Sequence, residues 1–101
     1  MLYSLTMINL IKELSEKGIK FEEDINLEDK IVPHLEIVLD IKKNPCLEDL
    51  GDILKKIYIE NGLKINECGN TNFLALNHGV FYSVVYSIIE DRYKITQEII
   101  K

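Results

Sequence analysis

Apolar residues near the start of the chain recur every three or four positions, which is the spacing of one face of an amphipathic helix. Ser4 precedes the run and belongs to the residue types that cap helix N-termini, and Gly18 follows it where a left-handed residue often ends a helix. We therefore predict a helix over residues 4–17. Its apolar face consists of Tyr3, Met7, Ile8, Leu10, Ile11 and Leu14.

The same spacing returns in the middle of the chain, over residues 45–61. Asn44 and Pro45 supply an N-cap and a proline suited to the first helical turn, and Asn61 with Gly62 supplies the stop. We predict a second helix here. Its apolar face consists of Leu47, Leu50, Ile53, Leu54, Ile57 and Tyr58.

Residues 27–43 fit two patterns. A helix would place Ile31, Leu35, Val38 and Leu39 on one face. A half-buried strand would instead bury Leu35, Ile37, Leu39 and Ile41, which alternate with other residues. Proline is tolerated in a first helical turn and damaging later, so a helix with Pro33 would begin near Val32 or kink there. Of the two patterns we favour a helix over 33–43.

Residues 77–94 sort into three faces when they are placed on a helix that begins at Asn77. An apolar arc contains Phe81, Val84, Val85, Ile88 and Ile89, and a polar arc contains Ser83, Ser87, Glu90, Asp91 and Lys94. Between them lies a border of three tyrosines, Tyr82, Tyr86 and Tyr93. Such a border either closes the edge of a core or anchors a partner, because tyrosine is amphipathic and frequent at interfaces.

These patterns together predict a mainly α fold, a single domain over 1–101 built as a compact bundle of four to five helices. The helices lie near 4–17, 33–43, 45–61 and 77–93, and Gly69-Asn70 allows a short β-hairpin at 63–76. The alternative is an α+β fold. In that fold 19–25, 35–42 and the hairpin form a small sheet.

The charge of the chain argues against nucleic acid as a direct partner. The chain carries 17 acidic and 12 basic residues, a formal net charge of −5, and Arg92 is its one arginine. Arginine is the preferred contact for phosphate and guanine, and phosphate binding requires an excess of positive charge. The many isoleucines, lysines and asparagines are also typical of a low-GC microbe or a virus of one.

An acidic cluster precedes the ambiguous segment, and it comprises Glu22, Glu23, Asp24, Glu28 and Asp29. It lacks the alternating aspartates, glycine and terminal glutamate of a calcium loop, so we predict no metal here. A solvated face is its ordinary interpretation. Its functional interpretation is contact with a basic surface on a partner protein.

Two cysteines, Cys46 and Cys68, without a recognisable export signal indicate reduced thiols in a cytoplasm. Their spacing from His34 and His78 lacks the closely paired ligands of zinc modules, and we predict no cofactor. Cys68 with His78 remains a candidate nucleophilic pair, because such a pair needs only spatial proximity. No apolar run reaches the length of a membrane span.

The sequence thus favours a small acidic intracellular protein that inhibits or regulates a larger protein by covering part of its surface, as immunity proteins, antitoxins and viral anti-defence inhibitors do. The predicted partner-binding residues are the tyrosine border and the acidic cluster. Two other hypotheses stand beside it. One is a small enzyme or enzyme subunit that uses Cys68 and His78, and the other is a structural subunit that forms homo-oligomers.

Overall fold

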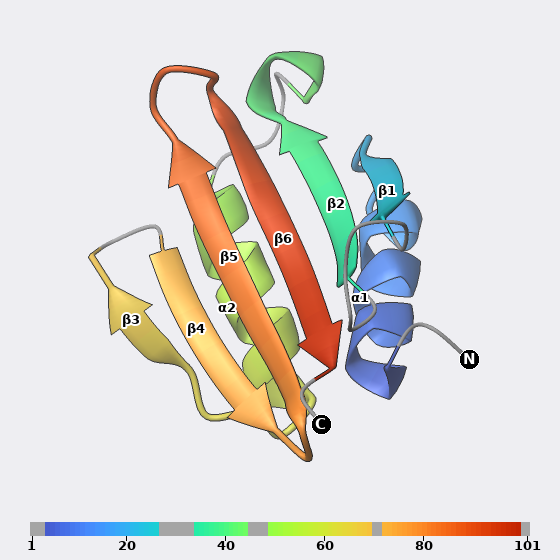
Figure 1. Ribbon diagram of the computed structural model, residues 1–101. Helices are drawn as coiled ribbons and strands as arrows, with labels where there is room; N and C mark the ends of the chain where they lie inside the picture. The colour runs from blue at the N-terminus through green and yellow to red at the C-terminus, as the bar shows by residue number, and fades with distance from the viewer. Residues whose placement is uncertain (1–3, 27–33, 45–48, 70–71, 100–101) are drawn as a thin grey trace.

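A six-stranded sheet and two α-helices make up the described parts of the chain, residues 4–26, 34–44, 49–69 and 72–99 of a computed structural model (Figure 1). The helices are α1 (Leu5–Glu16) and α2 (Leu50–Glu60), and a short 3-10 helix, η1 (Ile41–Lys43), follows the second strand. The strands are β1 (Glu22–Asn26), β2 (His34–Asp40), β3 (Asn66–Cys68), β4 (Asn72–Asn77), β5 (Val80–Ser87) and β6 (Arg92–Ile99).

The sheet is antiparallel throughout, and its spatial order is β1-β2-β6-β5-β4-β3. Strand β6 joins two units that are separate in sequence. It pairs on one side with β2, where His34 is opposite Glu98, and on the other with β5, where Val80 is opposite Ile99. Both helices lie behind the sheet in Figure 1, with α1 near β1 and β2 and α2 behind the other half.

The core lies between the helices and one face of the sheet. Every second residue of β2 points into it, and Leu35, Ile37 and Leu39 are completely buried. The helices contribute Met7, Leu10, Leu14, Leu54, Ile57 and Tyr58 to the same core. We call the sheet face that looks away from both helices the open face.

The prediction of a helix over 4–17 is confirmed by α1. The hydroxyl of Ser4 accepts a hydrogen bond from the backbone N–H of Met7, 3.2 Å away, and so caps the helix. The same hydroxyl accepts one from the Tyr82 hydroxyl at 2.7 Å. Because Tyr82 belongs to β5, this bond ties the start of α1 to the sheet.

The second predicted helix is confirmed over Leu50–Glu60, and Asn61 with Gly62 (φ +83°) ends it as expected. Residues 45–48, including Pro45 and Cys46, lie outside the described residues. Asn44 is not the cap of α2. Its side chain bonds the backbone of Lys20 and of Asp40, and thereby joins the chain before β1 to the end of β2.

The predicted helix over 33–43 is wrong, because residues 34–40 form β2. The period-two pattern of Leu35, Ile37 and Leu39 is the correct one, since all three side chains lie on the core face. Val38 fitted the helical pattern only because the open face also carries an apolar residue. The prediction for Pro33 lies outside the described residues.

The predicted three-faced helix over 77–93 is also wrong, because these residues form β5, a turn and the start of β6. His78 (φ +49°) and Gly79 (φ +76°) form a two-residue turn between β4 and β5 instead of opening a helix. Two successive positive φ values match a type I′ turn, which suits the twist of a hairpin. Val84 is buried, as predicted, but Val85, Ile88 and Ile89 are exposed.

The mainly α bundle and the description of the chain as helical are therefore corrected to an antiparallel α+β fold. The hairpin expected at 63–76 is confirmed by β3 and β4. The alternative α+β prediction located three parts of the sheet but omitted β5 and β6. None of the helices among the described residues combines the length and the apolarity needed to cross a membrane.

Candidate functional site

The predicted tyrosine border is not a continuous surface in the structure. Tyr82 and Tyr93 are core residues, with exposed fractions of 2% and 5%. Tyr82 packs on the ring of Tyr58, with 5.7 Å between centroids, and its hydroxyl bonds Ser4. These two side chains therefore join the helices to the sheet.

Tyr86 is half-buried at the far end of β5. Its ring packs against Tyr93 at a centroid distance of 5.1 Å, and its hydroxyl donates a hydrogen bond to Asp91 Oδ1 at 2.7 Å. This bond to a carboxylate raises the pKa of Tyr86, because it stabilises the protonated hydroxyl. Tyr86 thus links the end of β5 to the residue before β6.

The structure describes only part of the acidic cluster. Glu22 and Glu23 are exposed in β1, and in the register of the sheet Glu22 is opposite Val38 and Asp24 is opposite Glu36. Neighbouring strand residues point to opposite faces, so Glu22 belongs to the open face and Glu23 does not. Glu28 and Asp29 lie outside the described residues.

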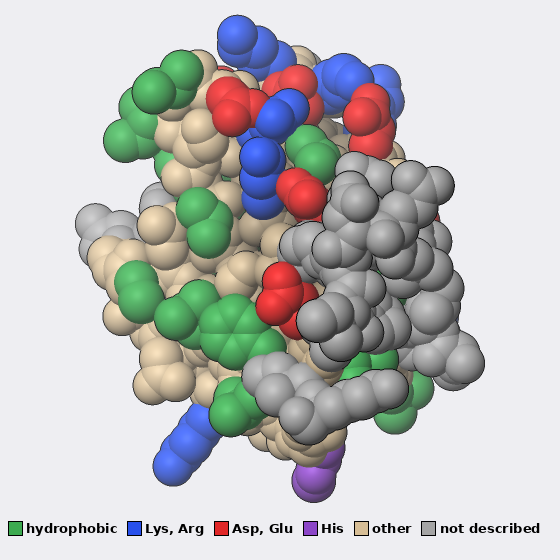
Figure 2. All heavy atoms as spheres, in the orientation of Figure 1, with side chains coloured by type: hydrophobic (Ala, Val, Ile, Leu, Met, Phe, Trp, Pro, Cys, Tyr) green, Lys and Arg blue, Asp and Glu red, His purple; other side chains and the backbone are tan. Residues whose placement is uncertain are grey.

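The open face carries a group of apolar residues on β4 and β5. Phe81 is opposite Leu76, Ser83 is opposite Leu74, and Val85 follows two positions along β5. Leu76 is 64% exposed, Val85 is exposed, and Leu74 and Phe81 are half-buried. We call Leu74, Leu76, Phe81 and Val85 the apolar patch, and Figure 2 shows hydrophobic side chains over these two strands.

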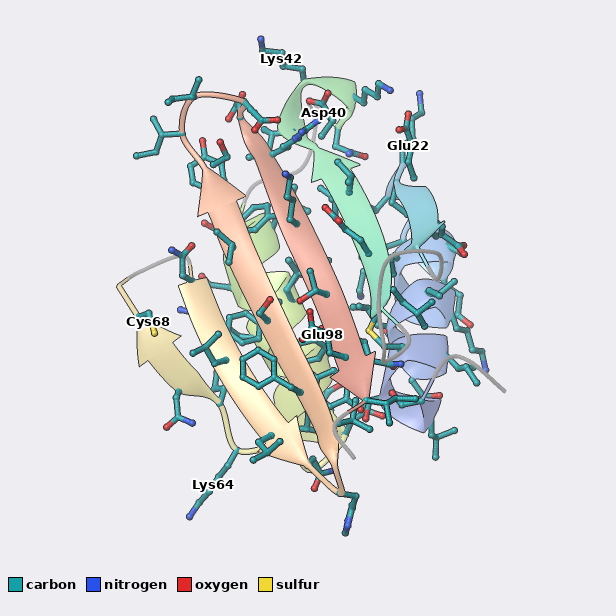
Figure 3. All side chains as sticks on the ribbon, in the orientation of Figure 1. Glu22, Asp40, Lys42, Lys64, Cys68 and Glu98 are labelled. Carbon is teal, nitrogen blue, oxygen red and sulfur yellow. The ribbon has the colours of Figure 1, made fainter. Side chains whose placement is uncertain are left out.

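The other half of the open face is charged. Lys94 of β6 is opposite both Val85 and Val38, and Glu98 is opposite Phe81. Beyond β6, carboxylates of β1 and β2 occupy the face, and Figure 3 labels Glu22 and Asp40 at its upper end. An apolar half and a charged half therefore share one surface.

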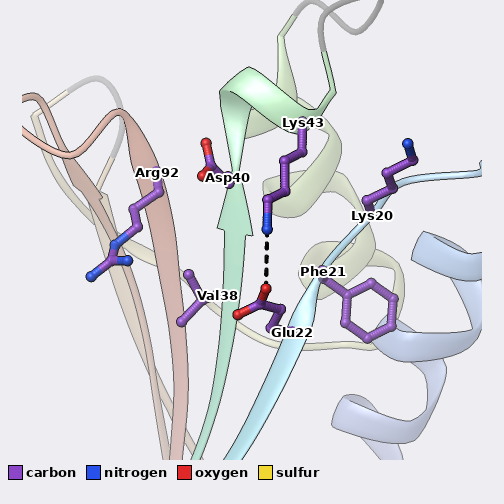
Figure 4. Close-up of a pocket in the computed structure, with 7 residues that line it drawn as sticks. All are labelled: Lys20, Phe21, Glu22, Val38, Asp40, Lys43 and Arg92. Carbon is purple, nitrogen blue, oxygen red and sulfur yellow. Dashed lines mark hydrogen bonds and ion pairs between the residues drawn. The ribbon is translucent and has the colours of Figure 1, made fainter.

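A hollow of about 310 Å³ lies at the upper end of this charged half (Figure 4). Its lining includes Lys20, Phe21, Glu22, Val38, Asp40, Lys43 and Arg92. Lys43 Nζ lies 3.1 Å from Glu22 Oε1, and Arg92 forms an ion pair with Glu90. Since cations and carboxylates of the chain pair with one another here, the hollow is a mixed polar surface without a strong field of one sign.

The structure does not bring Cys68 and His78 together. Cys68 is exposed and pairs with Asn72 at one end of β4, whereas His78 follows Asn77 at the other end (Figure 3). At about 3.4 Å per residue, the strand separates its two ends by about 17 Å. In the described parts of the chain, His, Cys, Asp and Glu side chains form no group of three that could hold a metal.

Comparison of the chain with protein-family models, with curated proteins and with solved structures gives no match.

The apolar patch was missed by sequence reasoning, although the sequence contains a signal for it. Residues 73–76 read Phe-Leu-Ala-Leu, and a strand with this run has apolar side chains on both faces. Phe73 and Ala75 are buried, because the helices cover the sheet face that carries them. Leu74 and Leu76 lie on the opposite face. Which face a helix covers is decided by tertiary structure, so the patch is defined only once the sheet is known.

Proposed function

We propose that this protein is a small acidic protein-binding protein that inhibits or regulates a larger protein by covering part of its surface with the open face of its sheet. This keeps the function inferred from the sequence but changes the surface that performs it. The proposed contact surface is the apolar patch in place of the tyrosine border. Glu22 of the acidic cluster remains part of this surface.

The observation that carries the proposal is the exposure of the apolar patch. Four large apolar side chains on adjacent strands, from Leu74 to Val85, are neighbours on one face of the sheet. Contiguous exposed apolar surface of this kind is uncommon on proteins that act alone, and it marks interaction sites. Two of the four, Leu74 and Phe81, are half-buried by their neighbours, which fixes their position before a partner arrives.

The charges around the patch define the partner's chemistry. The chain has a net charge of −5, and the charged half of the open face carries both signs, with Glu22, Glu36 and Asp40 on β1 and β2 and with Arg92 and Lys94 on β6. Complementary charge steers proteins together and selects the orientation in which they meet. We therefore infer a partner that is basic overall and that presents an apolar area beside charges of both signs.

The test compares two aspartate variants at similarly exposed apolar positions. Leu76→Asp with Val85→Asp places charge in the apolar patch, whereas Ile59→Asp places it on α2, where Ile59 is 56% exposed on the helix layer. The protein is used as bait in cells of its source, and the captured protein is purified for direct binding measurements. We expect the double variant to bind it at least about 100-fold more weakly and Ile59→Asp to bind it normally, since interface centres tolerate charge poorly.

Circular dichroism confirms that each variant is folded before binding is compared. Equal binding by the wild type and the double variant would refute the assignment of the open face. If light scattering shows a multimer that the double variant dissociates, the partner is a second copy and the homo-oligomer hypothesis replaces this one. Charge reversal at Glu22 and Glu36 is expected to slow association at low salt.

A further inference from the structure

The turn between β5 and β6 exposes two neighbouring isoleucines. Ile88 is 83% exposed and Ile89 is 97% exposed, more than any other large apolar side chain among the described residues. They belong to the short segment between Ser87, which ends β5, and Arg92, which begins β6. Figure 1 shows this turn projecting beyond the end of β4 at the upper left.

The turn is held in place by side chains on both of its strands. Glu90 donates its backbone N–H to Ser87 Oγ at 3.2 Å, and Asp91 Oδ1 accepts the hydrogen bond of the Tyr86 hydroxyl. Asp91 has φ +52°, a left-handed conformation that aspartate adopts more readily than most residues. The segment is therefore a defined turn with polar contacts below the isoleucines.

Two further contacts fix the base of the turn to the rest of the fold. The carbonyl oxygen of Asp91 accepts a hydrogen bond from the backbone N–H of Ile41 in η1, at 3.1 Å. Arg92, the first residue of β6, pairs with Glu90 in the turn. A loop that is already ordered loses less conformational freedom on binding, and β-branched isoleucine adds little side-chain entropy to that loss.

The isoleucines follow β5, the strand that carries two of the four residues of the apolar patch. Val85, the last member of the patch along β5, precedes Ile88 by three residues. Figure 2 shows hydrophobic side chains at the upper left, beyond those of the open face. A single partner that covers the patch can therefore also reach the turn.

The chemistry of the turn favours a protein pocket over a lipid surface. Glu90 and Asp91 follow the isoleucines directly, and the chain as a whole is acidic. Membrane-surface segments use basic and aromatic residues beside their apolar ones, because most cell membranes are anionic. Arg92 balances the charge of Glu90 through their ion pair, which leaves Asp91, the acceptor of the Tyr86 hydroxyl, as the carboxylate that a basic group on the rim of an apolar pocket would complement.

We propose that the β5–β6 turn inserts Ile88 and Ile89 into an apolar pocket of the partner protein, and that a basic group at the rim of this pocket faces Asp91. This inference rests on the proposed function, because it assigns a second contact to the same partner. It adds that the partner is concave where the turn meets it. A projecting, preordered turn of this kind fits a cleft better than the broad open face of the sheet does.

The experiment places photo-reactive benzoylphenylalanine at position 89 of the 101-residue chain, and at position 59 as the control. Irradiation in a lysate of source cells labels what contacts each position, and mass spectrometry locates the linked residues. The labelled protein is then purified and titrated with the wild type, with Ile88→Asp/Ile89→Asp, and with Ile59→Asp. Vesicles of phosphatidylcholine with phosphatidylserine are tested in parallel by co-sedimentation.

The expected result is a link from position 89 to residues of an apolar pocket in another protein, and no such link from position 59. Ile88→Asp/Ile89→Asp should weaken binding of that protein at least about 100-fold, equivalent to about 2.8 kcal/mol, while Ile59→Asp leaves it unchanged. Both isoleucines are exposed, so the folded state should tolerate the change.

Several outcomes would overturn the inference. These are a link from position 89 to a flat surface or to a second copy, no link at all, unchanged affinity of the double variant, or binding of the wild type to vesicles that the double variant loses. If Leu76→Asp/Val85→Asp loses the partner while Ile88→Asp/Ile89→Asp keeps it, the turn is not a contact and the proposed function still holds. If both double variants keep the partner, both proposals fail.

Discussion

Val84 and Val85 are neighbours in β5, yet their side chains lie on opposite faces of the sheet. Val84 is completely buried between the sheet and the helices, whereas Val85 belongs to the exposed apolar patch. On a helix both residues would have faced the same core. The burial of Val84 and the exposure of Val85 are therefore what a strand produces and a helix does not.

We predict that Val84→Asp unfolds the protein or destabilises it by at least about 4 kcal/mol, because it buries a carboxylate without a partner. Val85→Asp should cost about 1 kcal/mol or less, since its carboxylate remains in water. Urea denaturation followed by circular dichroism measures both values. Similar losses for the two variants would contradict the strand assignment.

At the scale of elements, a glycine of α2 lies directly against a tyrosine of the sheet. A Cβ atom at Gly51 would lie 2.9 Å from the Tyr93 hydroxyl oxygen and 3.7 Å from ring carbon Cζ. Tyr93 is nearly buried and its ring packs on Tyr86, so it has little room to move. Glycine at this position of α2 is explained by that contact.

Gly51→Ala should therefore destabilise the protein by about 1–2 kcal/mol, although alanine is the better helix former by about 1 kcal/mol. In a Tyr93→Phe background the clashing oxygen is gone, and the same substitution should become neutral or stabilising. A double-mutant cycle measured by urea denaturation gives the coupling between the two sites. Additive effects would mean that α2 does not approach β6 at this point.

The same elements show what could be predicted from the sequence. Helices α1 and α2 each have one apolar face and clear end signals, Ser4 and Gly18 for α1 and Asn61-Gly62 for α2, so local pattern was sufficient. Strand β5 has apolar residues on both faces, and Phe81, Val84 and Val85 also fit a helical period. Its many valines and aromatic residues were the signal that favoured a strand.

The candidate site could be predicted only in part, because its residues come from distant segments. Glu22 was identified from the acidic cluster and lies on the open face. Leu76 and Phe81 are opposite each other on β4 and β5. This pairing can be predicted only if His78-Gly79 is recognised as a hairpin turn. The tyrosines were singled out as surface residues because a helix was assumed.

At the scale of the whole molecule, the buried tyrosines make the free energy of unfolding depend on pH in the alkaline range. Burial raises the pKa of Tyr58, and burial with the nearby Asp52 carboxylate raises that of Tyr93 despite a backbone hydrogen bond from Gly51 that lowers it. The folded state thus holds these protons more tightly than the unfolded chain, in which tyrosine has a pKa of about 10. Their contribution to stability is complete below pH 10 and is lost as the pH rises further.

We predict that the free energy of unfolding falls steeply above about pH 10, by up to about 1.4 kcal/mol per pH unit for Tyr58 alone. Tyr58→Phe should make this fall shallower. It should change stability little at pH 7, because the Tyr58 hydroxyl makes a long contact of 3.9 Å to Met7 Sδ. Urea denaturation at pH 7 and at several values above 10 tests this, and parallel pH profiles for both proteins would contradict it.

The position of β6 has a consequence for how the protein is made. Residues 92–99 are synthesised after every other strand, but they lie between β2 and β5 in the finished sheet. A nascent chain that has not yet produced them has two separate units, the β1-β2 pair and the three-stranded β3-β4-β5 unit, and the inner strands β2 and β5 expose unpaired backbone groups. Folding of the sheet therefore has to follow translation of this segment, and a ribosome stalled before it would hold a chain prone to aggregate.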